Sequence, residues 1–98
     1  MLLWPEPKLP ELARDLSPNF EEGQEQFRAR VADAIEVPLP EGELIELLIE
    51  QGFRLSESDR MAGVTRSRFP CQLHWRIRWN AQAGIVHEVA ANYGSACL

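Results

Sequence analysis

The sequence predicts an α+β domain of two layers, in which two N-terminal helices pack on one face of a three- or four-stranded antiparallel sheet. Apolar residues recur at helical spacing through 20–35 and again through 44–49. From residue 53 onward this period gives way to alternation, and two alternating runs around Gly84 are typical of a β-hairpin. Helices followed by strands favour a sheet with its helices on one side.

The length of 98 residues allows one domain, which we expect at 17–98 after a proline-rich arm at 1–16. Trp4, Leu9, Leu12 and Leu16 are candidate anchors of the arm, and a solvated tail is the alternative. We expect no membrane span, because no run of 18 apolar residues occurs. Early prolines argue against a signal-peptide segment at the start, although prior removal of such a peptide is compatible with the sequence.

Charge is distributed unevenly along the chain. The net charge is -5, but residues 1–50 carry -8 and residues 51–98 carry +3, and all six basic residues of the second half are arginines. An acidic protein is a poor general binder of nucleic acid, because phosphate binding requires many exposed cations. We therefore expect no nucleic-acid partner, while a local basic strip remains compatible with the composition.

The first helix is expected to begin at Ser17-Pro18. Ser17 is a good N-cap, Pro18 suits the first helical position, and Glu21 and Glu22 favour the positive end of the helix dipole. One apolar stripe should face the core, formed by Phe20, Phe27, Val31, Ala34 and Ile35.

The second helix is expected to begin at Pro40, after a break at 37–40, and to stop near Gln51. Gly52 suits the left-handed position that follows a helix, and Phe53 can pack back on Leu48. Beyond it, strands are expected from Phe53 and through 61–68.

In the hairpin, the apolar residues of the first strand should face the helices: Leu73, Trp75, Ile77 and Trp79. Pairing of Trp79 with Ile85 or His87 would place Ile85, Val89, Ala91, Tyr93 and also His87 on the same face. In these registers Cys71 lies opposite Tyr93 or Ser95, and Cys97 lies further along the strand. A bend at Gly94-Ser95 would then be needed for a disulfide between Cys71 and Cys97. Two reduced thiols in a cytoplasmic protein are the alternative.

The opposite face of the same strand carries His74, Arg76 and Arg78. Arg66 and Arg68 are expected to extend this strip if 61–68 pairs alongside. Arginine pairs with carboxylates through two parallel hydrogen bonds, so the strip is a candidate docking surface for a protein with an acidic surface. An ordinary solvated face, balanced by Glu88, is the alternative.

No catalytic, phosphate-binding or metal-binding motif accompanies these features, so we expect a non-enzymatic protein without cofactor or metal. The leading hypothesis is an interaction module of the adaptor, inhibitor or immunity type. A second hypothesis is an acidic mimic that presents Glu43, Glu46 and Glu50 to a basic partner. A third is a small enzyme whose site contains Cys71 with His74 or His87.

Three segments carry a resemblance to a known family: Leu39-Pro40-Glu41-Gly42, Gln51-Gly52-Phe53 and the strand Trp75 to Trp79. Over residues 20–97 the pattern resembles small bacterial envelope proteins of the SmpA/OmlA (BamE-like) type and the related repeat of β-lactamase inhibitor proteins. The chain differs from those lipoproteins in having no N-terminal lipidation cysteine. The resemblance implies protein binding without catalysis, and a periplasmic or cell-envelope location in which a disulfide would form.

Overall fold

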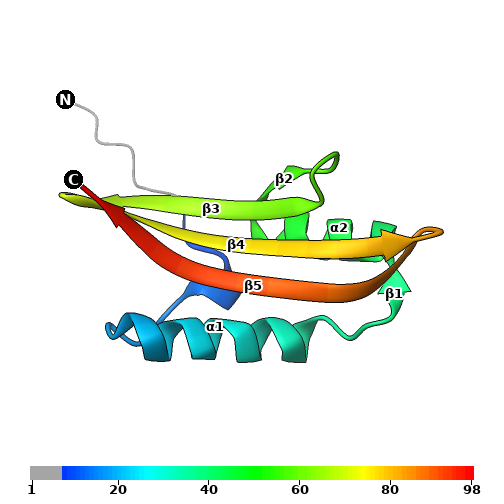
Figure 1. Ribbon diagram of the computed structural model, residues 1–98, viewed down its shortest axis with the longest axis horizontal. Coiled ribbons are helices and arrows are strands. Elements are labelled where there is room, and N and C mark those ends of the chain that lie inside the picture. The colour runs from blue at the N-terminus through cyan, green and yellow to red at the C-terminus, as the bar shows by residue number, and fades with distance from the viewer. Residues whose placement is uncertain (1–7) are drawn as a thin grey trace.

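The computed structural model describes residues 8–98, so the expected anchor Trp4 lies outside the described residues. It contains two helices and a curled five-stranded antiparallel sheet of order β1-β5-β4-β3-β2 (Figure 1). The elements are a 3₁₀ turn (Glu11–Ala13), α1 (Phe20–Ala34), β1 (Leu39–Pro40), α2 (Glu41–Gln51), β2 (Arg54–Ser56), β3 (Met61–Arg68), β4 (Cys71–Gln82) and β5 (Ile85–Cys97).

The predicted α+β class is confirmed, but the sheet has five strands rather than three or four. The additional strand is β1, whose two residues pair with β5 as Leu39 opposite Val86 and Pro40 opposite Ile85. A two-residue strand shows no alternation, so the same segment indicated only a break between helices.

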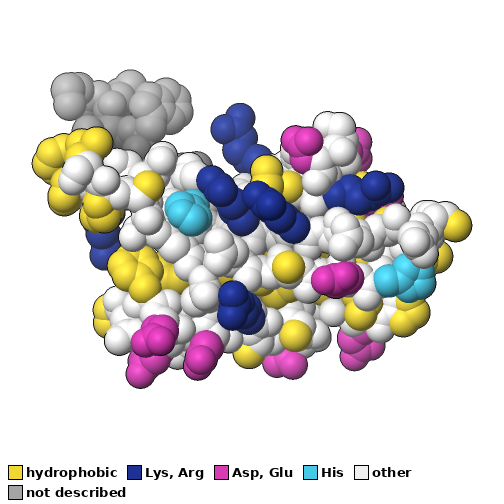
Figure 2. All heavy atoms as spheres, in the orientation of Figure 1, with side chains coloured by type: hydrophobic (Ala, Val, Ile, Leu, Met, Phe, Trp, Pro, Cys, Tyr) yellow, Lys and Arg dark blue, Asp and Glu magenta, His cyan; other side chains and the backbone are white. Residues whose placement is uncertain are grey.

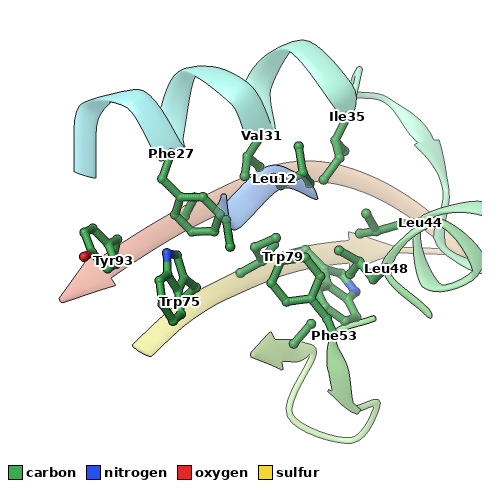
Figure 3. Close-up of a cluster of buried hydrophobic side chains, with 14 of the residues drawn as sticks. Leu12, Phe27, Val31, Ile35, Leu44, Leu48, Phe53, Trp75, Trp79 and Tyr93 are labelled. Carbon is green, nitrogen blue, oxygen red and sulfur yellow. The ribbon is translucent and has the colours of Figure 1, made fainter. Parts of the chain in front are cut away.

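The core lies between the helices and one face of the sheet. Phe27 and Val31 of α1, Ile35 directly after it, and Leu44 and Leu48 of α2 are buried. They meet the inward side chains of the central hairpin, Trp75, Ile77, Trp79, Ala91 and Tyr93 (Figure 3). Of the predicted α1 stripe, Phe20 and Ala34 are exposed instead. Phe20 nonetheless lies 5.3 Å from the ring of Tyr93, measured between ring centroids.

The start of α1 differs from the prediction. The N-cap is Asn19, whose side chain accepts a hydrogen bond from the Glu22 backbone N–H at 3.1 Å. Ser17 lies two residues earlier and donates to the Glu22 carboxylate at 2.9 Å. Asn and Ser are comparable caps, and here Asn19, which directly precedes the first helical residue Phe20, takes the role.

The end of α2 matches the prediction. Gly52 adopts the left-handed conformation with φ of 99°, and the N–H of Phe53 bonds to the carbonyl of Leu48 at 3.0 Å. Phe53 is buried, and an apolar contact of this kind often accompanies a Schellman-type cap. The chain therefore turns sharply from α2 into β2 and the sheet.

The register of the hairpin corrects the prediction. Trp79 lies opposite Val89, and Cys71 lies directly opposite Cys97, so no bend at Gly94-Ser95 is needed. The irregularity lies at the other end, where a β-bulge between Asn80 and Ala81 leaves His87 without a partner residue.

The bulge changes which side chains of β5 face inward near the turn. Val86 is buried, Ile85 is only half-buried, and His87 is exposed instead of lying beside the tryptophans. Beyond the bulge, Val89, Ala91 and Tyr93 lie on the tryptophan face as expected.

The described part of the expected arm, residues 8–16, lies against the domain. Leu12 and Ala13 belong to the buried core, and Leu9 and Leu16 pack against it. The backbone N–H of Leu12 donates to the side-chain oxygen of Gln51 at 3.2 Å, which ties this segment to the end of α2.

Candidate functional site

The face of the sheet that is turned away from the helix core is the candidate site, and we call it the open face. It brings together three of the predicted residues, His74, Arg76 and Arg78, at alternate positions of β4. Both arginines are exposed and His74 is half-buried. Figure 2 shows this side of the molecule, with Lys and Arg side chains across its middle.

The structure does not bring Arg66 and Arg68 to the open face. Arg66 lies opposite Leu73 and Arg68 opposite Cys71, so both share the face of Trp75 on the helix side. The charge of Arg68 also acts on Tyr93, because it offsets part of the rise that burial causes in the pKa of that phenol. The expectation that these two arginines extend the strip is wrong.

Arg54, which was not predicted, lies on the open face where Arg66 and Arg68 were expected. It lies opposite Gly63 of β3, which in turn lies opposite Arg76 of β4, so Arg54 and Arg76 stand in one row across three strands. Phe53 is buried and Arg54 exposed. The alternation that begins at Phe53 was therefore the signal that would have placed Arg54 outward.

The guanidinium groups of the open face have no carboxylate counterion among the described residues. Within residues 8–98, Arg54, Arg76 and Arg78 form no ion pair with a carboxylate. Glu88, the acid expected to balance them, instead accepts a hydrogen bond from Asn80 at 3.4 Å. Unpaired guanidinium groups on a surface are free to bind an external carboxylate.

His74 precedes Arg76 and Arg78 along β4, at one end of the basic part of the open face. Burial, together with the charge of Arg76, lowers the pKa of the imidazole below its ordinary value of 6.5, so His74 is neutral at pH 7. The ring lies over Gly94, where an added Cβ would stand 3.1 Å from Cε1. Its Nδ1 is buried without a hydrogen-bond partner in the described part of the chain.

The two cysteines form the predicted disulfide, with an S–S distance of 2.00 Å. While the bond is intact, Cys71 offers no thiolate for nucleophilic chemistry. The inward-facing side of β4 carries Cys71, whereas His74 lies on the open face and His87 lies at the far end of the hairpin. The Cys/His arrangement considered from the sequence is therefore not assembled.

One structural contact was not predicted from the sequence. Oε2 of Glu41 accepts hydrogen bonds from Trp79 Nε1 and Arg60 Nε, each at 2.7 Å. These donors lower the pKa of Glu41 below its ordinary value of 4.5, the Arg60 guanidinium more than the indole. Glu41 is thus a structural residue that ties α2 to the sheet.

Across residues 8–98, no group of three or more His, Cys, Asp or Glu side chains is placed to hold a metal ion. In the same residues, no helix has the length and apolar character that crossing a membrane requires. Comparisons with protein-family models, curated proteins and solved structures find no match to the chain. The family resemblance drawn from the sequence pattern stays a prediction.

Proposed function

We propose that this protein is a non-enzymatic interaction module of the adaptor, inhibitor or immunity type, which binds an acidic surface of another protein through the open face. The observation that carries the proposal is the set of guanidinium groups at Arg54, Arg76 and Arg78 on one sheet face, none of which forms an ion pair within residues 8–98. An antiparallel sheet holds their backbone positions, so the backbone loses little conformational freedom when a partner binds.

The charge on the helix side supports a protein partner over a nucleic acid. Acidic residues outnumber basic ones on both helices, and the net charge of the protein is -5, whereas Arg54, Arg76 and Arg78 lie on the open face. A nucleic acid would meet few cations and would be repelled by the rest of the surface. A protein with a local acidic patch needs only the open face.

The disulfide supports a location outside the cytoplasm. Disulfides persist in oxidising compartments such as the bacterial periplasm and are rare in reducing ones. We therefore place the proposed function in the periplasm or cell envelope, in line with the resemblance of pattern, and cytoplasmic action would apply to a reduced form.

The proposal is tested by charge exchange with an identified partner. The wild-type protein serves as bait, and a captured candidate is purified and its affinity measured by calorimetry. Arg76→Glu with Arg78→Glu should abolish binding, and reversing acidic residues of the partner to lysine should restore it. Unchanged affinity of the double arginine variant would overturn the proposal.

The acidic mimic is retained as a second candidate because of one observation on α2. Ile49 is 58% exposed, and the exposed carboxylates of Glu46 and Glu50 lie on the same helix. An exposed apolar side chain can contact a partner while the carboxylates beside it attract the partner's basic groups. In the same assay, loss of binding only when Glu43, Glu46 and Glu50 are changed to lysine would favour this candidate.

A further inference from the structure

Arg54 and Arg76 flank a hollow in the open face whose floor is Gly63. Because neighbouring strands lie about 4.8 Å apart, the two arginine backbones are roughly 10 Å apart with a glycine between them. The hollow has a volume of about 300 Å³ and is lined by Arg54, Leu55, Ser56, Met61, Ala62, Gly63 and Arg76.

Gly63 lies beside the Arg76 side chain and close to the backbone of β4. A Cβ added at Gly63 would lie 3.6 Å from Cγ of Arg76 and 3.3 Å from the carbonyl oxygen of Trp75. The stem of Arg76 therefore lies against the bare backbone of β3. A glycine inside a strand weakens it, and it often marks a place where another group approaches closely.

Asp59 is an acidic residue in the adjacent turn, and it is not a counterion of Arg54 or Arg76 in the described part of the chain. Asp59, in the turn between β2 and β3, accepts a hydrogen bond from the hydroxyl of Ser56 at 2.7 Å. It forms no ion pair with Arg54 or Arg76 in the described part of the chain. Arg54 and Arg76 thus border a hollow, and no carboxylate of residues 8–98 is bound to either of them.

Arg78 lies next to the hollow but in a different setting. Its neighbours across the sheet are Met61 of β3 and Ala90 of β5, so no second guanidinium stands in its row. Arg78 therefore provides a matched comparison: the same residue type on the same face of the same strand, without the paired cation.

We infer that Arg54 and Arg76 form a socket for one carboxylate, the side chain of an Asp or Glu on the protein partner. This inference rests on the proposed function and names the point at which the partner is held. Each guanidinium can donate two parallel hydrogen bonds to a carboxylate, and two of them on opposite sides of the hollow leave a defined position for the anion. Arg78 and the rest of the open face then add long-range attraction.

The test uses a single-carboxylate probe, N-acetylglutamate N-methylamide, with N-acetylglutamine N-methylamide as the uncharged control. Binding is followed through the Nε–Hε resonances of the arginines by NMR. The signals of Arg54 and Arg76 should shift together and saturate with one dissociation constant, and the control should shift neither. Inorganic phosphate is titrated separately, and tighter binding of phosphate would overturn the assignment to a carboxylate.

Variants separate a socket from diffuse attraction. Arg54→Gln should weaken probe binding about three- to fivefold, and Arg54→Lys should weaken it almost as much because lysine lacks the planar fork. Arg78→Gln, the matched comparison, should weaken probe binding less than Arg54→Gln, because it removes only long-range attraction. Gly63→Ala should weaken binding without a change in charge, with folding checked by thermal unfolding.

The outcomes also distinguish the socket from the proposed function. If Arg54→Gln and Arg78→Gln weaken binding of the probe and of the identified partner equally, the socket is wrong while the acidic-partner proposal stands. If neither variant, nor the charge reversal of Arg76 and Arg78, alters binding of the partner, both are wrong.

Discussion

The indole Nε1 of Trp79 donates a hydrogen bond of 2.7 Å to Oε2 of Glu41, the first residue of α2. The same oxygen accepts the Arg60 guanidinium, and the backbone N–H of Glu41 donates to the carbonyl of Gly84 at 2.9 Å. One residue therefore joins the helix to the central strand, to the β2–β3 turn and to the hairpin turn. The indole N–H of the buried Trp79 needs a hydrogen-bond acceptor, and Glu41 provides one that apolar core residues could not.

Replacing Glu41 by alanine should destabilise the protein, because it leaves the indole N–H of Trp79 buried without an acceptor. The matched control is Glu43→Ala, which removes an exposed acid from the same first turn of α2. We expect a drop of several degrees in the midpoint of thermal unfolding for Glu41→Ala and little change for Glu43→Ala. Equal effects would mean that only the helix dipole is involved.

The Glu41 contact should also make stability depend on pH in acid. The pKa of this carboxyl is lower in the folded protein than its ordinary value of 4.5, so its contribution is complete above pH 4.5. As the pH falls below 4.5, the unfolded state takes up the proton first and the contribution is lost through the folded pKa. The difference in unfolding free energy between the wild type and Glu41→Gln, measured in urea, should narrow over this range. A constant difference from pH 7 to pH 3 would contradict the assignment.

Two glycines in helices should respond oppositely to alanine. A Cβ at Gly23 would stand 3.0 Å from the ring of Tyr93 and 3.0 Å from the carbonyl oxygen of Ser17, and Tyr93 is held by stacking on Trp75. Gly23→Ala should therefore cost about 1 to 3 kcal/mol through overpacking. At Gly42 an added Cβ has no neighbour within 4 Å. Gly42→Ala should be neutral or stabilise by up to about 1 kcal/mol. Chemical denaturation of both variants measures the contrast, and stabilisation by Gly23→Ala would show that Tyr93 moves freely.

Removing the disulfide should lower stability without changing the fold. Cys71 and Cys97 are 26 residues apart in sequence, and closing a loop of this size stabilises a protein by roughly 3 to 4 kcal/mol in the chain-entropy model. The Cys71→Ser/Cys97→Ser variant should lose about this amount in urea unfolding, and the reduced wild type should behave like it. Alkylation followed by intact-mass measurement supplies the check: the unreduced protein should take no label and the reduced protein two.

The ends of α2 and the central strand could be predicted because local chemistry determines them. The left-handed position after a helix favours glycine, which Gly52 supplies, and the tryptophans of β4 alternate with polar residues. The register of β5 was not predicted, because it depends on one unpaired residue, His87. The sequence did contain an indication of the bulge. Val86 and Val89 are both apolar but three positions apart, and regular alternation cannot place both on the inward face, where the structure has them.

The candidate site was predicted in part for a similar reason. Alternation within β4 placed His74, Arg76 and Arg78 together, but the contribution of β3 depended on pairing between strands. Ala62 is buried and Val64 packs against the core, and Arg66 and Arg68 continue the same alternate positions. The strand's own apolar residues thus indicated that these arginines lie on the helix side, whereas Arg54 reaches Arg76 only through the non-local row across Gly63.

Acidic residues outnumber basic ones on both helices, whereas Arg54, Arg76 and Arg78 lie on the open face, so the two sides of this protein differ in charge although its net charge is -5. An acidic partner is repelled when it approaches the helix side and attracted when it approaches the sheet, over about 8 to 10 Å of solvent at physiological salt. The field therefore turns the two molecules into the productive orientation before they touch. Added salt should slow association more than it speeds dissociation, because orientation during the encounter is the step that the field assists.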